Sequence, residues 1–125
     1  MIHDCIIGIG SNIEPEQNIA AALFLLRQEQ ELIAVSSLIK TSPIGIVEQP
    51  DFLNGAAKVI TEMEIADFKN YLKKLEDRLM RDRTSPKFGP RTIDLDVVLW
   101  DGEILDPDYY SRDFLKTAVE EIRLT

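Results

Sequence analysis

Apolar residues recur at helical spacing in the middle of the chain. They lie three or four residues apart, at Ile65, Phe68, Leu72, Leu75 and Leu79. Residues at this spacing share one face of an α-helix. The pattern therefore predicts a helix over residues 65–80 that packs against a core through one side.

The remaining apolar segments predict strands and two further helices. A short apolar run that ends in a glycine-rich turn predicts a first strand over residues 2–9. Pro15 suits the first turn of a helix, and apolar residues repeat at helical spacing after it. Three more strands are predicted over residues 31–40, 52–62 and 92–100, and a last short helix over residues 112–122.

The order of these elements predicts the fold class. A strand–helix–strand–strand–helix–strand series followed by a terminal helix matches the split βαβ pattern. We expect an α+β, ferredoxin-like βαββαβ sandwich, in which an antiparallel sheet carries helices on one face. No change of composition marks a linker, so the 125 residues are expected to form a single domain, 1–125.

Composition narrows the class of protein. The formal net charge of −8 argues against non-specific binding to nucleic acid or to an anionic membrane. The apolar run near the start is too short to span a bilayer, so we expect a cytoplasmic protein. We also expect a monomer or a weak homodimer. Cys5 lies in an apolar segment and is expected to be a packing residue. With His3 as the only histidine, neither a zinc site nor a Cys–His nucleophile is expected.

Positive charge is concentrated in one short segment. Residues 73–91 contain seven basic and three acidic residues, a net charge of +4 that leaves −12 for the rest of the chain. Such a segment can be a solvated helix face followed by a charged loop, or it can bind an anion such as polyphosphate. The basic residues are Lys73, Lys74, Arg78, Arg81, Arg83, Lys87 and Arg91.

Two carboxylates follow this segment on a predicted strand. Asp94 and Asp96 are separated by one residue, so both side chains project from the same side of the strand. Such a pair is common on exposed strand faces and is weak evidence by itself. Close carboxylates repel unless a cation compensates them, and Mg²⁺ takes carboxylate oxygens together with substrate phosphates. With the arginines nearby, the pair predicts a site for metal and polyphosphate.

Two common nucleotide-binding motifs are absent from the sequence. Gly8-Ile9-Gly10 lacks the third glycine of the dinucleotide fingerprint, and no glycine-rich loop ends in Lys-Ser or Lys-Thr as a P-loop does. The expected polyphosphate site is therefore of another type.

Four motifs of the chain resemble those of the 6-hydroxymethyl-7,8-dihydropterin pyrophosphokinases of folate synthesis. The resemblance runs from Ile6 to about Leu105, and its last two motifs are long and specific. The motifs are Gly8-Ile9-Gly10-Ser11-Asn12, Thr41-Ser42-Pro43-Ile44-Gly45, Gln49-Pro50-Asp51-Phe52-Leu53-Asn54 and Gly89-Pro90-Arg91-Thr92-Ile93-Asp94-Leu95-Asp96.

The resemblance implies transfer of pyrophosphate from ATP to the hydroxymethyl group of the reduced pterin, with release of AMP. It implies ATP and pterin as partners, and two Mg²⁺ ions held by Asp94 and Asp96. The implied catalytic residues are Arg81, Arg83, Arg91, Asp94 and Asp96. The implied ATP-binding residues are Lys73, Glu76, Arg81, Arg83, Phe88, Arg91 and Arg112. The implied pterin-binding residues are Thr41, Ser42, Pro43, Ile44, Phe52, Asn54 and Phe114.

The chain departs from the family after Leu105. Family members usually carry a longer segment there with a Pro-His element that contacts nucleotide, whereas this chain has Asp106-Pro107-Asp108-Tyr109-Tyr110-Ser111 and no histidine. Three hypotheses follow: an active pyrophosphokinase, a noncatalytic homologue that binds nucleotide or pterin, and a pyrophosphokinase with a different acceptor. A purely structural protein would leave the Arg91 to Asp96 cluster unexplained.

Overall fold

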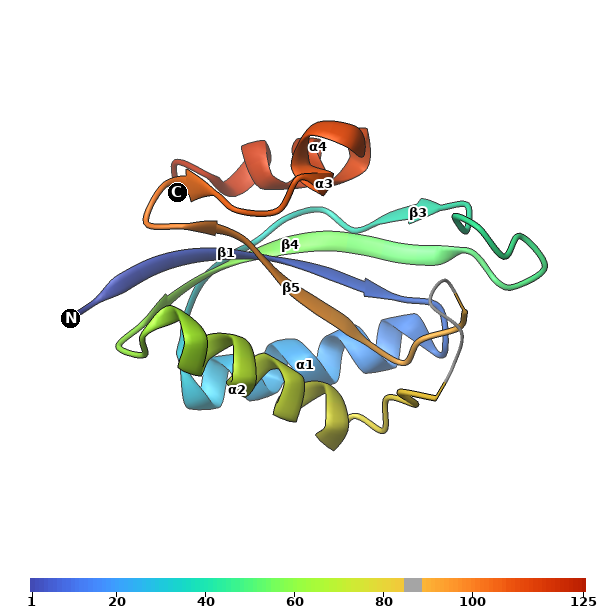
Figure 1. Ribbon diagram of the computed structural model, residues 1–125, viewed down its shortest axis with the longest axis horizontal. Coiled ribbons are helices and arrows are strands. Elements are labelled where there is room, and N and C mark those ends of the chain that lie inside the picture. The colour runs from blue at the N-terminus through green and yellow to red at the C-terminus, as the bar shows by residue number, and fades with distance from the viewer. Residues whose placement is uncertain (85–88) are drawn as a thin grey trace.

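A six-stranded antiparallel sheet lies between two layers of helices in the computed structural model, which describes residues 1–84 and 89–125 (Figure 1). Two expected ligand-contacting residues, Lys87 and Phe88, lie outside the described residues. The strands are β1 (His3–Ser11), β2 (Glu31–Val35), β3 (Ile39–Thr41), β4 (Phe52–Thr61), β5 (Asp94–Trp100) and β6 (Glu103–Ile104). The helices are α1 (Pro15–Glu29), α2 (Ile65–Arg78), α3 (Asp108–Ser111) and α4 (Asp113–Ile122).

The strands are ordered β2-β4-β1-β5-β6, and β3 also pairs with β4. The predicted ferredoxin-like α+β fold is confirmed. The strand predicted over residues 31–40 is wrong in one respect, because it is divided into β2 and β3. At the break, the Ser36 hydroxyl accepts a hydrogen bond from the Ala56 N–H at 2.8 Å, where a strand would offer a carbonyl. A side chain that replaces a backbone partner in this way interrupts the ladder.

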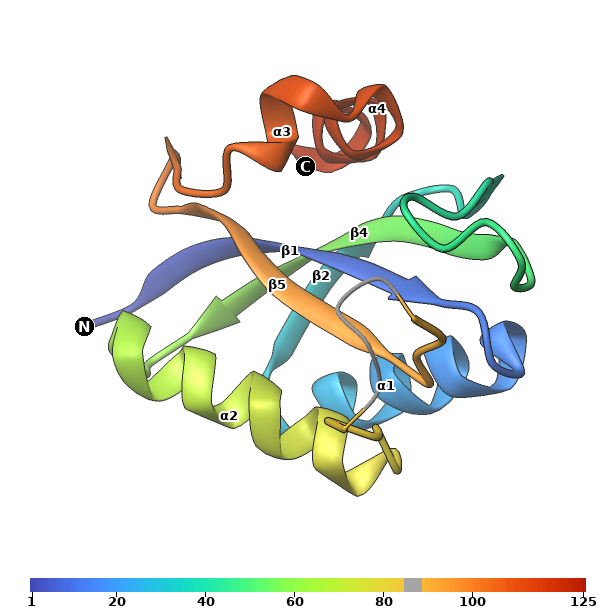
Figure 2. The ribbon, with the colours of Figure 1, turned by 45° about the vertical axis from the view of Figure 1, so that its right-hand side comes forward.

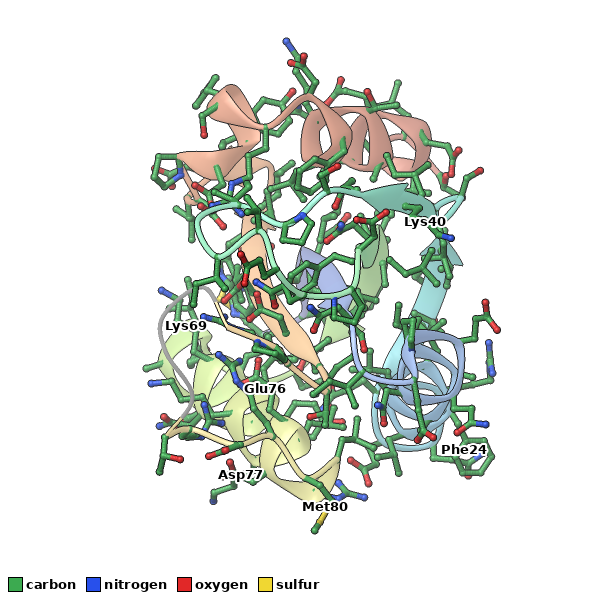
Figure 3. All side chains as sticks on the ribbon, turned by 90° about the vertical axis from the view of Figure 1, so that its right-hand side faces the viewer. Phe24, Lys40, Lys69, Glu76, Asp77 and Met80 are labelled. Carbon is green, nitrogen blue, oxygen red and sulfur yellow. The ribbon has the colours of Figure 1, made fainter. Side chains whose placement is uncertain are left out.

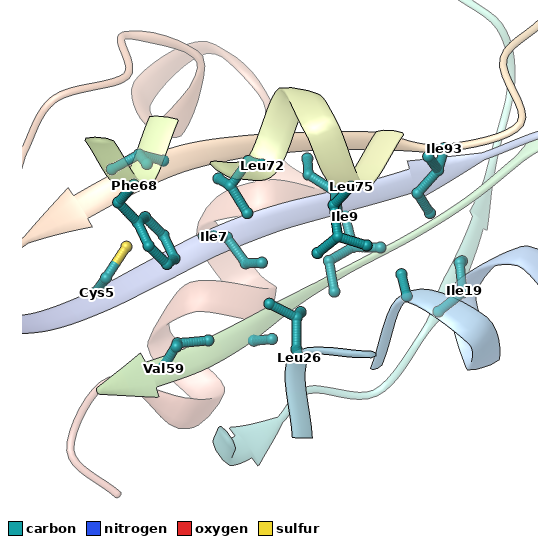
Figure 4. Close-up of a cluster of buried hydrophobic side chains, with 14 residues drawn as sticks. Cys5, Ile7, Ile9, Ile19, Leu26, Val59, Phe68, Leu72, Leu75 and Ile93 are labelled. Carbon is teal, nitrogen blue, oxygen red and sulfur yellow. The ribbon is translucent and has the colours of Figure 1, made fainter. Parts of the chain in front are cut away.

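Helices α1 and α2 cover one face of the sheet (Figure 2). The side chains of Cys5, Ile7 and Ile9 alternate to this face of β1 and are at most 3% exposed. They pack against the apolar stripes of both helices, including Phe68 and Leu72, in one buried cluster (Figure 4). The prediction that helices cover one face holds for α1 and α2.

Helices α3 and α4 lie on the opposite face of the sheet (Figures 1 and 2). A second buried cluster joins Val119 and Ile122 of α4 to Ile6 and Val98 of the sheet. Lys58 on β4 is 7% exposed, and its Nζ donates to the main-chain oxygens of Arg123 and Thr125 at 3.0 and 2.9 Å. These contacts hold α4 over one half of the face and leave the other half for a site.

None of the helices in residues 1–84 and 89–125 combines the length and the apolar character needed to cross a membrane.

Candidate active site

A cavity of about 260 Å³ lies on the sheet face that α4 leaves uncovered. We call it the sheet-face cavity. Its floor comes from β1, β4 and β5, where Gly10 is paired with Asn54 on one side and with Asp94 on the other. Gly8 is likewise paired with Asp96. Because paired residues point to the same face, the two glycines leave open space beside the two carboxylates.

Most of the residues expected to bind the pterin line this cavity. Six of them are lining residues, and Pro43 is not among them. The Asn54 Nδ2 donates to the Thr41 Oγ1, which directs the Asn54 Oδ1 toward Gly10. A flat ligand with amide-like edges could use such a fixed acceptor. The six lining residues are Thr41, Ser42, Ile44, Phe52, Asn54 and Phe114.

A second cavity of about 480 Å³, which we call the edge cavity, lies between α2 and β5. Within residues 1–84 and 89–125, β6 pairs with β5 only at Leu99 and Trp100, and the earlier part of β5 borders this cavity. Arg112, expected at the nucleotide, instead lines the sheet-face cavity, with its guanidinium 3.6 Å from Asp108. The residues expected to bind ATP that line the edge cavity are Lys73, Glu76, Arg81, Arg83 and Arg91.

The two cavities share a wall on β5. Arg91, Asp94, Asp96 and Asp106 line both of them. Asp94 is held between two guanidinium groups, 3.2 Å from Arg81 and 3.3 Å from Arg91. Asp96 has no cationic partner among the residues that the structure describes.

The pKa of Asp96 is raised to about 7. Partial burial is the largest cause, followed by the negative charges of Asp94, Glu76 and Asp106. The side chain still reaches the water of the cavities, although protein surrounds it on several sides. A cation bound here would offset the repulsion that raises this pKa.

Glu76 organises the arginines. Its side chain is 4% exposed and lies toward the end of α2, after Lys69 and before the outward-facing Asp77 (Figure 3). One carboxylate oxygen lies 2.7 Å from the Arg81 guanidinium and accepts the Leu95 N–H at 2.7 Å. The other lies 3.1 Å from Arg83. Glu76 thus ties two arginines to β5, and a contact between Glu76 and nucleotide stays a prediction.

The carboxylate pair fits Mg²⁺. No group of three or more histidine, cysteine, aspartate or glutamate side chains is arranged to hold a metal within residues 1–84 and 89–125. Mg²⁺ does not need such a group, because it is commonly held by one or two carboxylates together with phosphate oxygens and water. Asp94 and Asp96 project from the same side of β5 into space that both cavities share, as that type of site requires.

Three charged lining residues were not predicted from the sequence. Asp106 and Asp108 were noted only as departures from a family pattern, although both line the sheet-face cavity. Lys69 lines the edge cavity one helical turn before Lys73. The spacing of these two lysines on α2 was a usable signal, because residues four apart share a helix face.

The chain matches known pyrophosphokinases over nearly its whole length. The family described as 7,8-dihydro-6-hydroxymethylpterin-pyrophosphokinase matches residues 6–124. The chain is 38% identical, over 85% of its length and 67% of the relative's, to the 2-amino-4-hydroxy-6-hydroxymethyldihydropteridine pyrophosphokinase of Pseudomonas aeruginosa. The protein of the same name from Haemophilus influenzae is 32% identical over 93% of this chain and 79% of its own. The folate synthesis bifunctional protein of Arabidopsis thaliana is 29% identical over 78% of this chain and 20% of its own.

Proposed function

Because this chain belongs to the 7,8-dihydro-6-hydroxymethylpterin-pyrophosphokinase family, it transfers pyrophosphate to hydroxymethyldihydropterin in folate biosynthesis, and we propose that β5 is where its two substrates meet. The supporting observation is the wall that the two cavities share. A pterin in the sheet-face cavity and a triphosphate in the edge cavity would face each other across Arg91, Asp94 and Asp96.

For this reaction, the residues of the shared wall must position the two substrates and neutralise the charge of the phosphates. Phosphoryl transfer needs its reacting oxygens held in line and its developing negative charge balanced. Arg81, Arg83 and Arg91 line the edge cavity and supply N–H donors in the fork geometry that suits phosphate. Asp94 and Asp96 would hold Mg²⁺, which neutralises phosphate charge when it is bound.

Release of the arginines from their present partners would accompany binding. Arg81 and Arg91 contact Asp94 at 3.2 and 3.3 Å. A metal ion on Asp94 would compete for those carboxylate oxygens, and the phosphates would offer the guanidinium groups new acceptors. The same ion pairs thus keep the arginines close to the place where they are needed.

A direct assay tests the proposal. With ATP, Mg²⁺ and 6-hydroxymethyl-7,8-dihydropterin, we expect release of AMP together with the pterin diphosphate, and no AMP when EDTA replaces Mg²⁺. Calorimetry with a non-hydrolysable ATP analogue should accompany the assay. Binding of the analogue without any turnover would contradict the proposal and favour a noncatalytic homologue, and turnover with another alcohol in place of the pterin would show a different acceptor.

Replacement of Gly10 should weaken pterin binding selectively. A Cβ at Gly10 would lie 2.8 Å from the Asn54 Oδ1, too close for either atom to stay in place. We expect Gly10→Ala to raise the KM for the pterin by about tenfold, as the loss of one well-placed polar contact does, and to change the KM for ATP little. Steady-state kinetics with each substrate varied in turn measures both constants.

Gly8→Ala is the matched control. Gly8 lines the same cavity, but its Cβ would meet the flexible end of Leu115 at 3.2 Å. A smaller rise in the pterin KM is expected for this variant. An equal rise for both variants would show that Asn54 is not the group displaced.

A further inference from the structure

Asn12, the residue that follows β1, joins three segments of the site. It is 3% exposed, and its side chain and backbone form four hydrogen bonds to residues far away in the chain. The partners are Arg91 on one side, and Gln49 and Pro50 on the other.

The first side of Asn12 fixes the backbone of Arg91. The Asn12 N–H donates to the Arg91 carbonyl at 3.1 Å, and the Asn12 Oδ1 accepts the Arg91 N–H at 2.8 Å. Both polar groups of the Arg91 main chain are therefore bound to one residue. Arg91 precedes β5 and reaches Asp94 with its side chain, so this anchor helps to set where its guanidinium lies.

The second side of Asn12 fixes the segment between β3 and β4. The Asn12 Nδ2 donates to the Gln49 Oε1 at 2.8 Å and to the Pro50 carbonyl at 3.0 Å. The Gln49 Nε2 in turn donates to the Ile46 carbonyl at 2.6 Å, which shapes the turn before it. This segment carries Ser42 and Ile44 into the sheet-face cavity.

The orientation of the Asn12 amide is determined by its partners. The Arg91 N–H can only donate and the Pro50 carbonyl can only accept, so a flipped amide would oppose both groups. Three of the four hydrogen-bonding positions of the side chain, including both donors, are used in a buried place, where an unpaired group is costly.

We propose that Asn12 is a positioning residue that holds both the pterin-binding segment and the phosphate-binding Arg91 in their places at the site. The inference rests on the proposed function, because it assigns the two cavities to the pterin and to ATP. One rigid amide thus fixes the 42–50 segment in place relative to the backbone of Arg91.

Asn12→Asp removes the contacts to Gln49 and Pro50 but keeps an acceptor for Arg91. The carboxylate keeps an acceptor for the Arg91 N–H, but it cannot donate to Gln49 or Pro50 and instead faces the Pro50 carbonyl with like polarity. We expect the KM for the pterin to rise by about tenfold or more, with less than about a twofold change in the KM for ATP. Asn12→Ala removes the side-chain contacts on both sides, keeps only the backbone hydrogen bond to the Arg91 carbonyl, and should lower kcat as well.

Two further variants support the comparison. Asn18→Asp makes the same chemical change on the surface, where the Asn18 Nδ2 donates to the Ile13 carbonyl, and should leave all constants unchanged. Gln49→Met removes one of the two contacts that Asn12 makes to the segment, together with the Gln49 contact to Ile46, and keeps the contact to Pro50. It should raise the pterin KM by less than Asn12→Asp does. It keeps the test decisive if Asn12→Asp fails to fold, a point that circular dichroism at the assay temperature checks.

The outcomes separate the inference from the proposed function. An active wild-type enzyme with an unchanged pterin KM in both Asn12→Asp and Gln49→Met would overturn the inference and leave the function standing. Equal changes in kcat and in both KM values would also overturn it, because they indicate a general structural role. An inactive wild-type enzyme would count against the function itself.

Discussion

Asp96→Asn is expected to abolish pyrophosphate transfer and, at the same time, to stabilise the metal-free protein at pH 8. The asparagine leaves Mg²⁺ one carboxylate short, and loss of a metal ligand of this kind should lower kcat by about a thousandfold. Asp94→Ala should lower it by a similar factor. The assay is AMP release at saturating substrates, with circular dichroism to confirm that both variants remain folded.

The gain in stability follows from the raised pKa of Asp96, about 7 in the folded protein against about 4 in an unfolded chain. A carboxyl whose folded pKa is raised favours folding in its protonated form, so its contribution is present below about pH 4 and is lost as the pH rises through 7. Asparagine does not ionise and escapes this loss. The difference in melting temperature between variant and wild type should therefore grow from pH 4 to pH 8.

Two measurements test whether these effects are specific to Asp96. Glu62→Gln removes an exposed carboxylate at the turn before α2, outside the lining of both cavities, and should leave AMP release unchanged. Saturating Mg²⁺ should stabilise the wild-type protein but not Asp96→Asn, since a ligand stabilises only the state that binds it. Equal stabilisation of both proteins by Mg²⁺ would contradict the assignment of the metal to Asp96.

Glu76→Gln is expected to reduce both stability and activity. The amide can still accept the Leu95 N–H, but it leaves the Arg81 guanidinium, which is 15% exposed, without its closest carboxylate. Burial raises the pKa of Glu76, so the neutral amide escapes part of the cost of burying a charge, and Arg81 keeps Asp94 at 3.2 Å. We therefore expect a net loss of about 1–2 kcal/mol in the free energy of unfolding. Activity should fall about a hundredfold, because the arginines lose their fixed positions. Urea unfolding and steady-state kinetics measure the two effects.

Asp77→Asn is the matched control for Glu76→Gln. Asp77 is the next residue on α2 and pairs with the same Arg83 at 2.9 Å, but its side chain is 58% exposed. Exposed ion pairs contribute little to the free energy of unfolding, and loss of a negative charge near the C-terminal end of a helix is mildly stabilising. A change within about 0.5 kcal/mol is expected. Similar losses in the two variants would mean that burial of Glu76 does not decide its role.

Local patterns were sufficient for the fold and for the carboxylate pair. The helix predicted over residues 65–80 is observed as Ile65–Arg78, because apolar spacing reports a helix directly. The period of two along a strand places Asp94 and Asp96 on one side, as the shared lining of the cavities requires. Such features depend on neighbours in the sequence and can be read from it.

Contacts between distant segments account for what the sequence did not reveal. The resemblance implied a nucleotide contact for Glu76, whereas burial against β5 makes it the partner of two arginines, which the sequence did not predict. The strand β6 had a local signal that was overlooked. Asp101 and Gly102 have φ values of 51° and 85°, and an Asp-Gly pair between apolar segments is typical of a tight hairpin. The division of β2 from β3 depends on Ser36 meeting Ala56 and has no such signal.

The glycine positions of β1 give the sheet-face cavity an unusual combination of properties. At Gly8 and Gly10 the strand has no side chain on the cavity side, yet it is paired with β4 and with β5 along both edges. Water can reach this backbone at the half-buried Gly8, while the amide hydrogens remain engaged in the centre of the sheet. Amides of this kind exchange with solvent mainly when the whole sheet opens. The floor of the site should therefore be as slow to exchange deuterium as the strand beneath α4, although one is open to solvent and the other is covered.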